Sequence, residues 1–310
     1  MTEDSRIIHI AIAFDQNYTQ QFSALLSSVF LNSRGRKLSF HLIASGTSEE
    51  YRSRVQNYII AQGAKAVFYQ LDSQASSDLV LAGSWTQAVY HRLYFPELVS
   101  ADVDRLLYLD SDTLVVGDLQ ELFQMELGHY PVAAVYDVYV KKQELIGVPE
   151  GAYFNSGVLL MDIANWRRQS VSHKVLSYLR QYPERILYVD QCGLNAVLKD
   201  NWKRLDYKFN VLYSYLPFGS SGTNLGKFLA DKVILHFTLE RPWNFLCRNR
   251  FRSLYWHYLK LSPLADPGAK SFSDFSMSKI PTWLKIRSME LYFDYPFLQA
   301  SWKRIKAVLK

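Results

Sequence analysis

The sequence predicts one large α/β domain built on a mostly parallel, doubly wound sheet. Short apolar runs typical of buried strands alternate with longer segments whose apolar residues recur at helical spacing, and this β-α-β-α-β order favours parallel strands. The chain has 310 residues, 49% of them hydrophobic and 15% aromatic, which is enough for a large core. No linker rich in Pro, Gly or Ser divides it, so we expect one catalytic domain at 1–260 and an appended segment at 261–310.

The first 71 residues are predicted to form three strands separated by two helices. Apolar runs bounded by polar turns indicate the strands, and apolar residues three or four positions apart indicate the helices. Thr47 followed by Glu50 resembles a capping box at the start of the second helix. The strands are expected at 7–14, 38–44 and 66–71, and the helices at 18–32 and 47–61.

The middle of the chain contains the strand around which the rest is organised. This strand, at 106–109, ends in Asp110-Ser111-Asp112, and a second apolar run follows it. Further along, Asn155-Ser156-Gly157 is expected to precede an apolar strand, and Asp190 is placed to cap a helix. Other helices are expected at 85–95, 166–181 and 250–261, and other strands at 114–116, 132–136 and 232–237.

Two carboxylates one residue apart at the end of a buried strand are costly to desolvate unless they are paired or bind a metal. The oxygen ligands of Asp110 and Asp112 suit Mg²⁺ or Mn²⁺, and such a cation stabilises the charge that develops on a diphosphate. An Asp-rich turn is the ordinary alternative. A haloacid-dehalogenase-like phosphatase, with an Asp nucleophile, is another, but Leu114 stands where its Asp-x-Asp-x-Thr pattern requires Thr.

Polar residues at neighbouring strand ends are expected to face the same crevice. In open α/β sheets, ligands bind beyond the carboxyl ends of the strands, where Asp15, Asn17 and Asp110 all fall. His236 ends a later strand and is a candidate third metal ligand, although a buried structural histidine is the commoner case. No Gly-rich fingerprint follows the first strand, which argues against NAD or FAD.

Further side chains have the chemistry to bind a diphosphate or a sugar. Arg241 and Arg92 can meet a diphosphate with two hydrogen bonds. Asn155, Asp190 and Gln191 carry the amides and carboxylate that orient sugar hydroxyls. Taken singly, each also has an ordinary structural interpretation, such as a solvated helix charge, a turn or a helix cap.

The ordered segments AFDQNY, YHRL, LYLDSD, FNSGVLLMD, DQCGLN and LHFTLERPWN resemble the retaining glycosyltransferases of family 8 over about residues 7–260. That family includes bacterial lipopolysaccharide galactosyl- and glucosyltransferases and, more distantly, glycogenin. The resemblance implies a GT-A fold, a UDP-hexose donor carrying galactose or glucose, Mn²⁺ with Mg²⁺ as the other option, and a glycan or lipid-linked glycan acceptor.

The resemblance also implies a role for each matching residue. Gln191 and Asp190 are implied to be catalytic. The implied metal ligands are Asp110, Asp112 and His236. The implied binding residues are Ala13, Asp15 and Asn17 for the uridine and ribose, Arg92 for the donor, Asp137, Asn155, Asp190 and Gln191 for the sugar, and Arg241 for the diphosphate.

Three positions depart from the pattern of this family. Leu239 stands where Gly is usual, and Arg241 stands where Lys is usual. Cys192 occupies a position where some relatives carry an acidic residue that is proposed as a nucleophile. Without that carboxylate, we expect retention through a front-side path rather than through a covalent intermediate.

The C-terminal segment is basic and aromatic. Residues 279–310 hold seven Lys or Arg against two acidic residues, so +5 of the net charge of +6 lies there. Interleaved aromatic and aliphatic residues give it the composition of an interfacial helix, which favours contact with an anionic membrane. A terminal helix packed on the domain is the alternative. We expect no nucleic-acid binding, because no recognised module is present.

Two cysteines and a polar start, MTEDSR, favour a cytoplasmic protein without a signal peptide, held at the inner face of the cytoplasmic membrane by its tail. A catalytically silent sugar-nucleotide-binding or scaffold protein at the membrane is the alternative function. A self-glucosylating primer of the glycogenin type is a lesser one.

Overall fold

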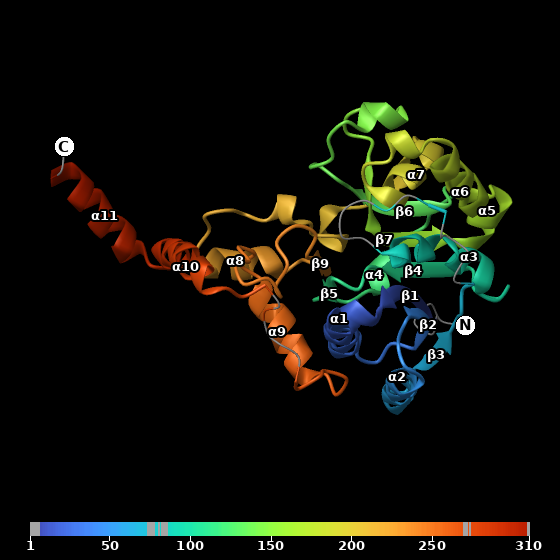
Figure 1. Cartoon of the computed structure of the whole chain (residues 1–310), viewed down its shortest axis with the longest axis horizontal. Helices are drawn as coiled ribbons and strands as arrows, with labels where there is room; N and C mark the ends of the chain where they lie inside the picture. The colour runs from blue at the N-terminus through green and yellow to red at the C-terminus, as the bar shows by residue number, and fades with distance from the viewer. Residues whose placement is uncertain are drawn as a thin grey trace.

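The computed structural model of the chain describes residues 7–72, 78–79, 81, 86–268, 272 and 274–308, with side chains as far as residue 302. Its body has helices on both faces of a central sheet (Figure 1). An arm made of the last two helices extends from this body in the same view.

The central sheet in the described chain has seven strands in the order β3-β2-β1-β4-β7-β6-β8. Strands β3, β2, β1 and β4 are mutually parallel, β7 is antiparallel to β4 and β6, and β8 is parallel to β6. The predicted α/β class with a mostly parallel sheet is confirmed. The strands are β1 (Ile8–Asp15), β2 (Leu38–Ser45), β3 (Lys65–Phe68), β4 (Arg105–Leu109), β6 (Val132–Tyr136), β7 (Phe154–Asp162) and β8 (Lys203–Arg204).

Alternate side chains of β1 fill two hydrophobic cores, one on each face of the sheet. Ile10 and Ile12 belong to the core that contains residues of α1 and α2, whereas Ala11 and Ala13 belong to the core that contains residues of α6 and α7. A strand that is buried on both faces must be apolar at nearly every position, as β1 is. The helices of the body are α1 (Thr19–Asn32), α2 (Glu49–Ala61), α3 (Phe95–Leu98), α4 (Gln120–Phe123), α5 (Ile163–Arg168), α6 (Val171–Gln181), α7 (Val189–Leu198), α8 (Gly222–Leu229) and α9 (Arg252–Leu261).

A second, two-stranded sheet joins β5 (Thr113–Val115) to β9 (Ile234–His236). The strands are antiparallel, and their register pairs Thr113 with His236. A third hydrophobic core, with residues from β5, β9, α8 and α9, supports this sheet. The pairing therefore brings His236 beside the turn that carries the two aspartates, although more than 120 residues separate them in the chain.

Three predicted helices differ from the observed ones. The helix expected at 166–181 is two helices, because Ser170 between α5 and α6 has a left-handed backbone with φ of 52°. The helix expected at 85–95 is a 3-10 helix, Gln87–Leu93, followed by α3, and Trp85 lies outside the described residues. Helix α7 begins at Val189, so Asp190 lies in its first turn and does not cap it.

Two local predictions are also wrong. Ser48 caps α2 by accepting a hydrogen bond from the N–H of Tyr51, whereas the hydroxyl of Thr47 donates to the carbonyl of Ala44. Strand β7 begins at Phe154, so Asn155, Ser156 and Gly157 are part of the strand rather than a segment before it. The register of β7 with β4 begins at Val158, and its register with β6 shifts between Phe154 and Leu159. These polar residues therefore lie at an irregularity of the ladder, where the carbonyl of Gly157 accepts a hydrogen bond from the N–H of Asp110.

The arm consists of α10 (Ile280–Asp294) and α11 (Pro296–Val308). Ion pairs dock α10 on the body, with Glu290 2.7 Å from Arg252 and Asp294 2.6 Å from Arg250. Within the described residues, no helix combines the length and the apolar character that a membrane span requires.

Candidate active site

A cleft of about 520 Å³ lies beyond the carboxyl ends of β1 and β4 and beside β9. Its walls contain almost every residue that the sequence singled out. These are Ala13, Asp15, Arg92, Asp110, Asp112, Asp137, Asn155, Asp190, Gln191, His236 and Arg241. The topology therefore collects side chains from across the first 241 residues at a single site.

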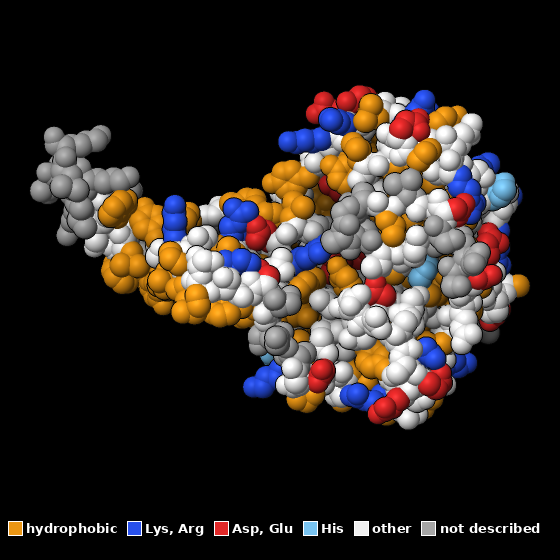
Figure 2. All heavy atoms as spheres, viewed as in Figure 1, with side chains coloured by type: hydrophobic (Ala, Val, Ile, Leu, Met, Phe, Trp, Pro, Cys, Tyr) orange, Lys and Arg blue, Asp and Glu red, His pale blue; other side chains and the backbone are white. Residues whose placement is uncertain are grey.

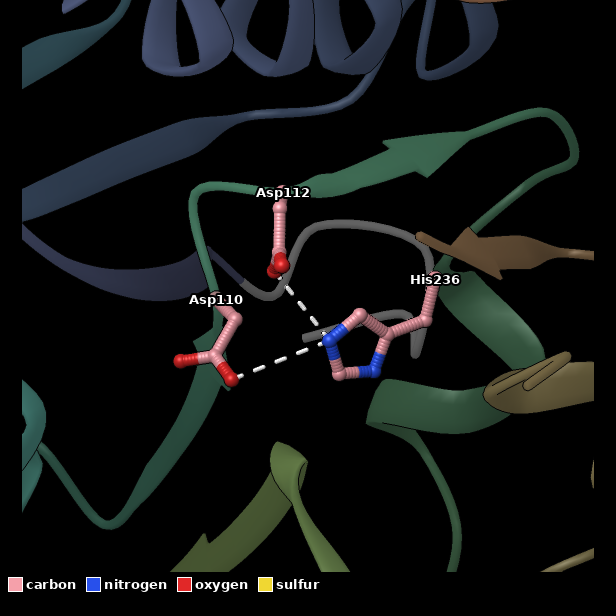
Figure 3. Close-up of side chains that lie close together, drawn as sticks. All are labelled: Asp110, Asp112 and His236. Atoms are coloured by element: carbon pink, nitrogen blue, oxygen red, sulfur yellow. Dashed lines mark hydrogen bonds and ion pairs between the residues drawn. The ribbon is translucent and has the colours of Figure 1, made fainter. Parts of the chain in front are cut away.

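Asp110, Asp112 and His236 converge on one point in the wall of this cleft (Figure 3). Asp110 follows β4, Asp112 precedes β5, and His236 ends β9. The Nε2 atom of His236 lies 3.1 Å from Oδ1 of Asp112 and 3.8 Å from Oδ2 of Asp110. One ligand atom from each residue lies within 4.8 Å of the others, so the three atoms fit around a single cation. Two carboxylate oxygens and an imidazole nitrogen suit Mn²⁺, and the oxygens suit Mg²⁺.

The charges at this point attract a cation. Burial lowers the pKa of His236, but the adjacent carboxylate of Asp112 outweighs burial and raises the pKa above its ordinary value. Burial likewise raises the pKa of Asp112, but His236 and Arg241 outweigh it, and the pKa lies below its ordinary value. A carboxylate that stays ionised and favours a protonated neighbour also favours a metal ion in that place.

Gly157 makes this convergence possible. A Cβ atom at this position would lie 2.2 Å from Cε1 of His236 and 2.6 Å from Oδ2 of Asp110. The carbonyl of Gly157 also accepts a hydrogen bond of 2.8 Å from the N–H of Asp110. The glycine of the FNSG segment is therefore required by the close approach of the imidazole, which the sequence did not reveal.

Arg92 is buried and joins two of the carboxylates in the cleft. Its guanidinium lies 2.9 Å from Oδ1 of Asp110 and 3.0 Å from Oδ2 of Asp190, and it lies over the ring of Tyr108. Burial disfavours the charged guanidinium, but the two aspartates outweigh burial and raise the pKa of Arg92. The contacts observed for Arg92 are thus internal, and the donor contact that the resemblance implies stays a prediction.

Asp190 is almost fully buried at the start of α7, yet it faces the cleft. Burial raises its pKa to about 6, with the charge of Asp110 adding to burial and Arg92 opposing it. Its Oδ2 atom makes no aligned hydrogen bond to the described residues, despite the ion pair with Arg92. Val189, the residue before it, has a φ of 33°, which β-branched residues rarely adopt, and strain of this kind occurs at functional sites.

Amide side chains from β7 and α7 form a network along the floor of the cleft. The Nδ2 group of Asn155 donates to Oδ2 of Asp137 at 3.1 Å and to Oε1 of Gln191 at 3.1 Å. Gln191 also accepts a hydrogen bond of 3.0 Å from the N–H of Ser156. These contacts hold both amides in fixed orientations, as a site that reads hydroxyl groups requires.

The profile described as Glycosyl transferase family 8 matches residues 9–247. The chain belongs to this family. The predicted family, and with it the GT-A fold, is confirmed. The chain is 29% identical to the general stress protein A of Bacillus subtilis over 82% of this chain and 93% of that protein.

Two relatives with a named activity match most of this glycosyltransferase. It is 28% identical to a lipopolysaccharide 1,2-glucosyltransferase of Escherichia coli, over 77% of this chain and 74% of that one. It is 27% identical to a lipopolysaccharide 1,3-galactosyltransferase of Salmonella typhimurium, over 78% of this chain and 74% of that one. Among solved structures, the galactosyltransferase LgtC with donor and acceptor sugar analogs has a TM-score of 0.72 and 24% identity, over 89% of this chain and 100% of that one. This structural likeness supports the shared fold.

The end of the cleft near β1 differs in part from the sequence-based assignment for this glycosyltransferase. Asp15 lines the cleft, but its carboxylate accepts hydrogen bonds from the N–H of Asn17 at 2.8 Å and from the hydroxyl of Thr86 at 2.6 Å. Asn17 is exposed and is not among the described residues that line the cleft. Tyr18, which sequence reasoning missed, lines it instead.

Two departures from the family pattern lie at the mouth of the cleft of this enzyme. Leu239 is 61% exposed and does not have a positive φ, so its side chain imposes no backbone strain where Gly is usual. Arg241 lines the cleft, and its guanidinium makes no ion pair or hydrogen bond within the part of the chain that the structure describes, although its carbonyl accepts a hydrogen bond from the N–H of Asn244. Its guanidinium is therefore available to an anionic ligand.

Cys192, the third departure, points away from the cleft of the glycosyltransferase. It is 3% exposed, and its sulfur lies 3.4 Å from the hydroxyl of Tyr153 and accepts a hydrogen bond from the N–H of Tyr188. It is not among the described residues that line the cleft. A thiol in this place has no path to a donor sugar.

Proposed function

We propose that this glycosyltransferase transfers galactose or glucose from a UDP-sugar to a glycan acceptor, with retention of configuration and with a requirement for Mn²⁺ or Mg²⁺. The observation that carries the proposal is the convergence of Asp110, Asp112 and His236 in the wall of the cleft. A divalent cation bound there supplies positive charge to the diphosphate that leaves. The supporting context is the family, whose retaining activity the resemblance implies.

The residues around this point have the chemistry to hold the two ends of the donor. The guanidinium of Arg241, which makes no hydrogen bond or ion pair with the described residues, can bind the diphosphate with its planar fork of donors. Tyr18 and the small side chain of Ala13 leave an apolar surface for the base, and Asp15 lies beside them. The side chain of Asn17 is exposed. Its proposed contact with the ribose rests on the resemblance of the segment AFDQNY, which also contains Asp15.

The sugar ring is proposed to lie over the amide network. Gln191 lies beneath the anomeric carbon and steadies the positive charge that develops there, and Asn155 and Asp137 hold Gln191 in place. Asp190 lines the cleft beside this network, and its carboxylate is proposed to orient a sugar hydroxyl.

The proposed transfer step is a front-side displacement. The acceptor hydroxyl attacks the anomeric carbon from the face that UDP leaves, and the phosphate oxygen that departs takes the proton of that hydroxyl. The carbon–oxygen bond to UDP breaks as the new glycosidic bond forms. No carboxylate stands at position 192 to form a covalent intermediate, which favours this front-side path.

The proposed acceptor is lipopolysaccharide or another cell-envelope saccharide. The support is the similarity to the glucosyltransferase of Escherichia coli and the galactosyltransferase of Salmonella typhimurium that act on lipopolysaccharide. A catalytically silent sugar-nucleotide-binding protein is less consistent with the site, because all three expected ligands are present and face one another.

Hydrolysis of UDP-galactose and UDP-glucose without an acceptor tests the proposed function. We expect turnover with Mn²⁺, its loss on addition of EDTA, and its recovery with excess Mn²⁺. The double variant Asp110→Asn, Asp112→Asn keeps the side-chain shapes but removes both charges, and it should lose at least about 100-fold in turnover. Full activity of this variant would refute the assignment of the metal ligands.

The configuration of the product tests the retaining mechanism. We expect NMR of the anomeric proton to show an α linkage, as in the donor. Cys192→Ser should keep most of the activity, because the thiol lies in the core between two tyrosines. A β product, or an inactive Cys192→Ser protein with native stability, would contradict the front-side path.

We also propose that the arm binds an anionic membrane surface, so that the enzyme is peripheral at the inner face of the cytoplasmic membrane. Figure 2 shows hydrophobic side chains gathered along the arm and interleaved with basic ones. Charge and exposed apolar groups together favour interfacial binding. Among the residues whose side chains the structure describes, the exposed large hydrophobic ones of α10, α11 and the turn between them are Leu284, Met289, Leu291, Tyr295, Phe297 and Trp302.

The docking of α10 decides where the arm is best cut. Removing residues 280–310 would leave Arg250 and Arg252 without their partners Asp294 and Glu290, and it would expose the face that α10 covers. Ending the chain after Tyr295 keeps these pairs and removes residues 296–310, which include α11 and hold four basic residues.

The shorter protein should lose most of its binding to anionic liposomes and keep its UDP-sugar hydrolysis. Each basic residue near an anionic leaflet contributes about 1 kcal/mol, and salt near 1 M should release the full-length protein. The measurement is co-sedimentation with liposomes that contain phosphatidylglycerol. Equal sedimentation of the two proteins would argue against the membrane role of α11.

A further inference from the structure

A buried asparagine that sequence reasoning did not single out contacts His236 at Nδ1, the ring nitrogen that does not face Asp110 and Asp112. Asn210 is fully buried and follows the short 3-10 helix Tyr207–Phe209. Its Oδ1 atom lies 3.0 Å from Nδ1 of His236, and its Nδ2 group donates to Oδ1 of Asn155 at 2.9 Å. It is thus the link between the histidine of the metal site and the amide network of the sugar site.

The backbone holds Asn210 in this position. The N–H of Val211 donates to the carbonyl of Ile234, and the N–H of His236 donates to the carbonyl of Val211. Residue 210 is therefore carried alongside β9, the strand that ends in His236. A small shift of the asparagine relative to the histidine would break this ladder.

The hydrogen bonds define which way each amide faces. The N–H of Gly157 is only a donor, and it lies 3.0 Å from Oδ1 of Asn155. The amide nitrogen of Asn155 accordingly faces the carboxylate of Asp137. Because Asn210 meets the oxygen of Asn155, it presents its NH₂ group there and its own oxygen to His236.

This chain of contacts determines the tautomer of His236. An oxygen opposite Nδ1 requires that Nδ1 carry a proton and donate it. A cation bound between the three side chains would replace the proton through which Nε2 contacts Asp112, and the lone pair of Nε2 would then be directed at that cation (Figure 3). Histidines that bind metals are oriented in this way by a partner at the other ring nitrogen.

We propose that Asn210 is a positioning residue that holds His236 in the Nδ1-protonated tautomer with Nε2 aimed at the metal ion. The proposal rests on the proposed metal-dependent function and adds to it a residue that touches neither the cation nor the donor. Asn210 also transmits the position of His236 to Asn155, so that the metal site and the sugar site are built around one buried amide.

Two substitutions separate this role from packing. Asn210→Leu has a similar shape but loses both hydrogen bonds, whereas Asn210→Asp keeps an oxygen opposite Nδ1 of His236 and loses the donor to Asn155. The readout is the affinity of the full-length protein for Mn²⁺ alone, measured by electron paramagnetic resonance. We expect Asn210→Leu to bind about 10- to 100-fold more weakly and Asn210→Asp to recover most of the wild-type affinity.

Asn165→Leu is the matched control. Asn165 is also a buried asparagine, and its Nδ2 group donates to the carbonyl of Gly128 at 2.9 Å, at the end of β7 away from the cleft. This variant should lose stability and keep the wild-type affinity for Mn²⁺. A loss of Mn²⁺ affinity in Asn210→Leu, but not in Asn165→Leu, would then come from the contact with His236 and not from the loss of a buried asparagine in general.

A second measurement reads the tautomer without activity and without a variant. In ¹⁵N-histidine-labelled protein loaded with diamagnetic Mg²⁺, the ring shifts of His236 should show a protonated Nδ1. A protonated Nε2, or Mn²⁺ affinity that Asn210→Leu leaves unchanged, overturns this inference while the metal-dependent function stands. If Asn210→Leu does not fold, the inference is tested by the ring shifts of His236 in the wild-type protein and by the Mn²⁺ affinity of Asn210→Asp. Wild-type protein that binds neither Mn²⁺ nor Mg²⁺ overturns the proposed function and this inference together.

Discussion

Gly157→Ala is expected to abolish divalent-cation binding and UDP-sugar hydrolysis. The added methyl would lie 2.2 Å from the imidazole of His236 and 2.6 Å from the carboxylate of Asp110, so at least one ligand must move by about 1 Å. A displacement of this size costs on the order of 100-fold in catalysis, and here it affects binding of the metal as well. Titration with Mn²⁺ and turnover of the UDP-sugar measure the two effects.

Gly226→Ala is the control for this substitution. Gly226 lies within α8, its backbone φ is not positive, and a Cβ atom there meets no atom within 4 Å. Alanine at this site should leave Mn²⁺ affinity and turnover unchanged and raise stability by up to about 1 kcal/mol. Wild-type metal affinity in Gly157→Ala would show that His236 does not approach Asp110 as the structure places it.

Arg92→Met is expected to destabilise the enzyme severely. The arginine is buried between Asp110 and Asp190, and removing it leaves two carboxylates without their counter-ion. Breaking a buried pair from one side costs about 3–5 kcal/mol. The midpoint of urea unfolding should fall accordingly, and UDP-sugar turnover should be lost even at temperatures where the variant stays folded.

Arg180→Met provides the comparison. The guanidinium of Arg180 lies 2.7 Å from Asp78, but both side chains are about half exposed, and exposed pairs are screened by water and salt. Its unfolding midpoint should match the wild type within error. If Arg92→Met had the same midpoint as Arg180→Met, the buried carboxylates would not depend on Arg92.

Much of the fold is predictable because its signals are local. Apolar runs of three to eight residues became strands. Their order gave the main sheet, whose carboxyl end carries Asp15 and Asp110, and the strand β9 that places His236 beside them. The errors in helix boundaries arose where the backbone φ angle of one residue determines where a helix begins or ends. The left-handed φ of Ser170 splits the helix expected at 166–181, and the positive φ of Val189 shifts the start of α7.

Site residues could be predicted from the sequence where they are charged and follow a strand. They could not be predicted where contacts with distant parts of the chain determine what a side chain does. Asp15 uses its carboxylate to cap the turn that follows β1, which leaves Asn17 exposed and turns Tyr18 to the cleft. Asn210 contacts residues 26 and 55 positions away in the chain, and no periodicity or motif marks it.

Arg92 shows the same limit of local reasoning. A basic residue in a helical segment ordinarily indicates a solvated face, and the alternative was a contact with the donor. The structure buries it between two carboxylates, because the 3-10 helix Gln87–Leu93 packs against β1 and α7. Only the fold brings the counter-charges of Arg92 together, since Asp110 and Asp190 lie 80 residues apart.

The central claim is that Asp110, Asp112 and His236 bind one divalent cation in the cleft. Anomalous diffraction from crystals of the enzyme with Mn²⁺ and UDP tests it most directly. The predicted result is one manganese peak within about 2.0–2.5 Å of a carboxylate oxygen of Asp110, a carboxylate oxygen of Asp112 and Nε2 of His236. A manganese peak elsewhere in the cleft, or UDP bound with no peak between these three side chains, would contradict the account.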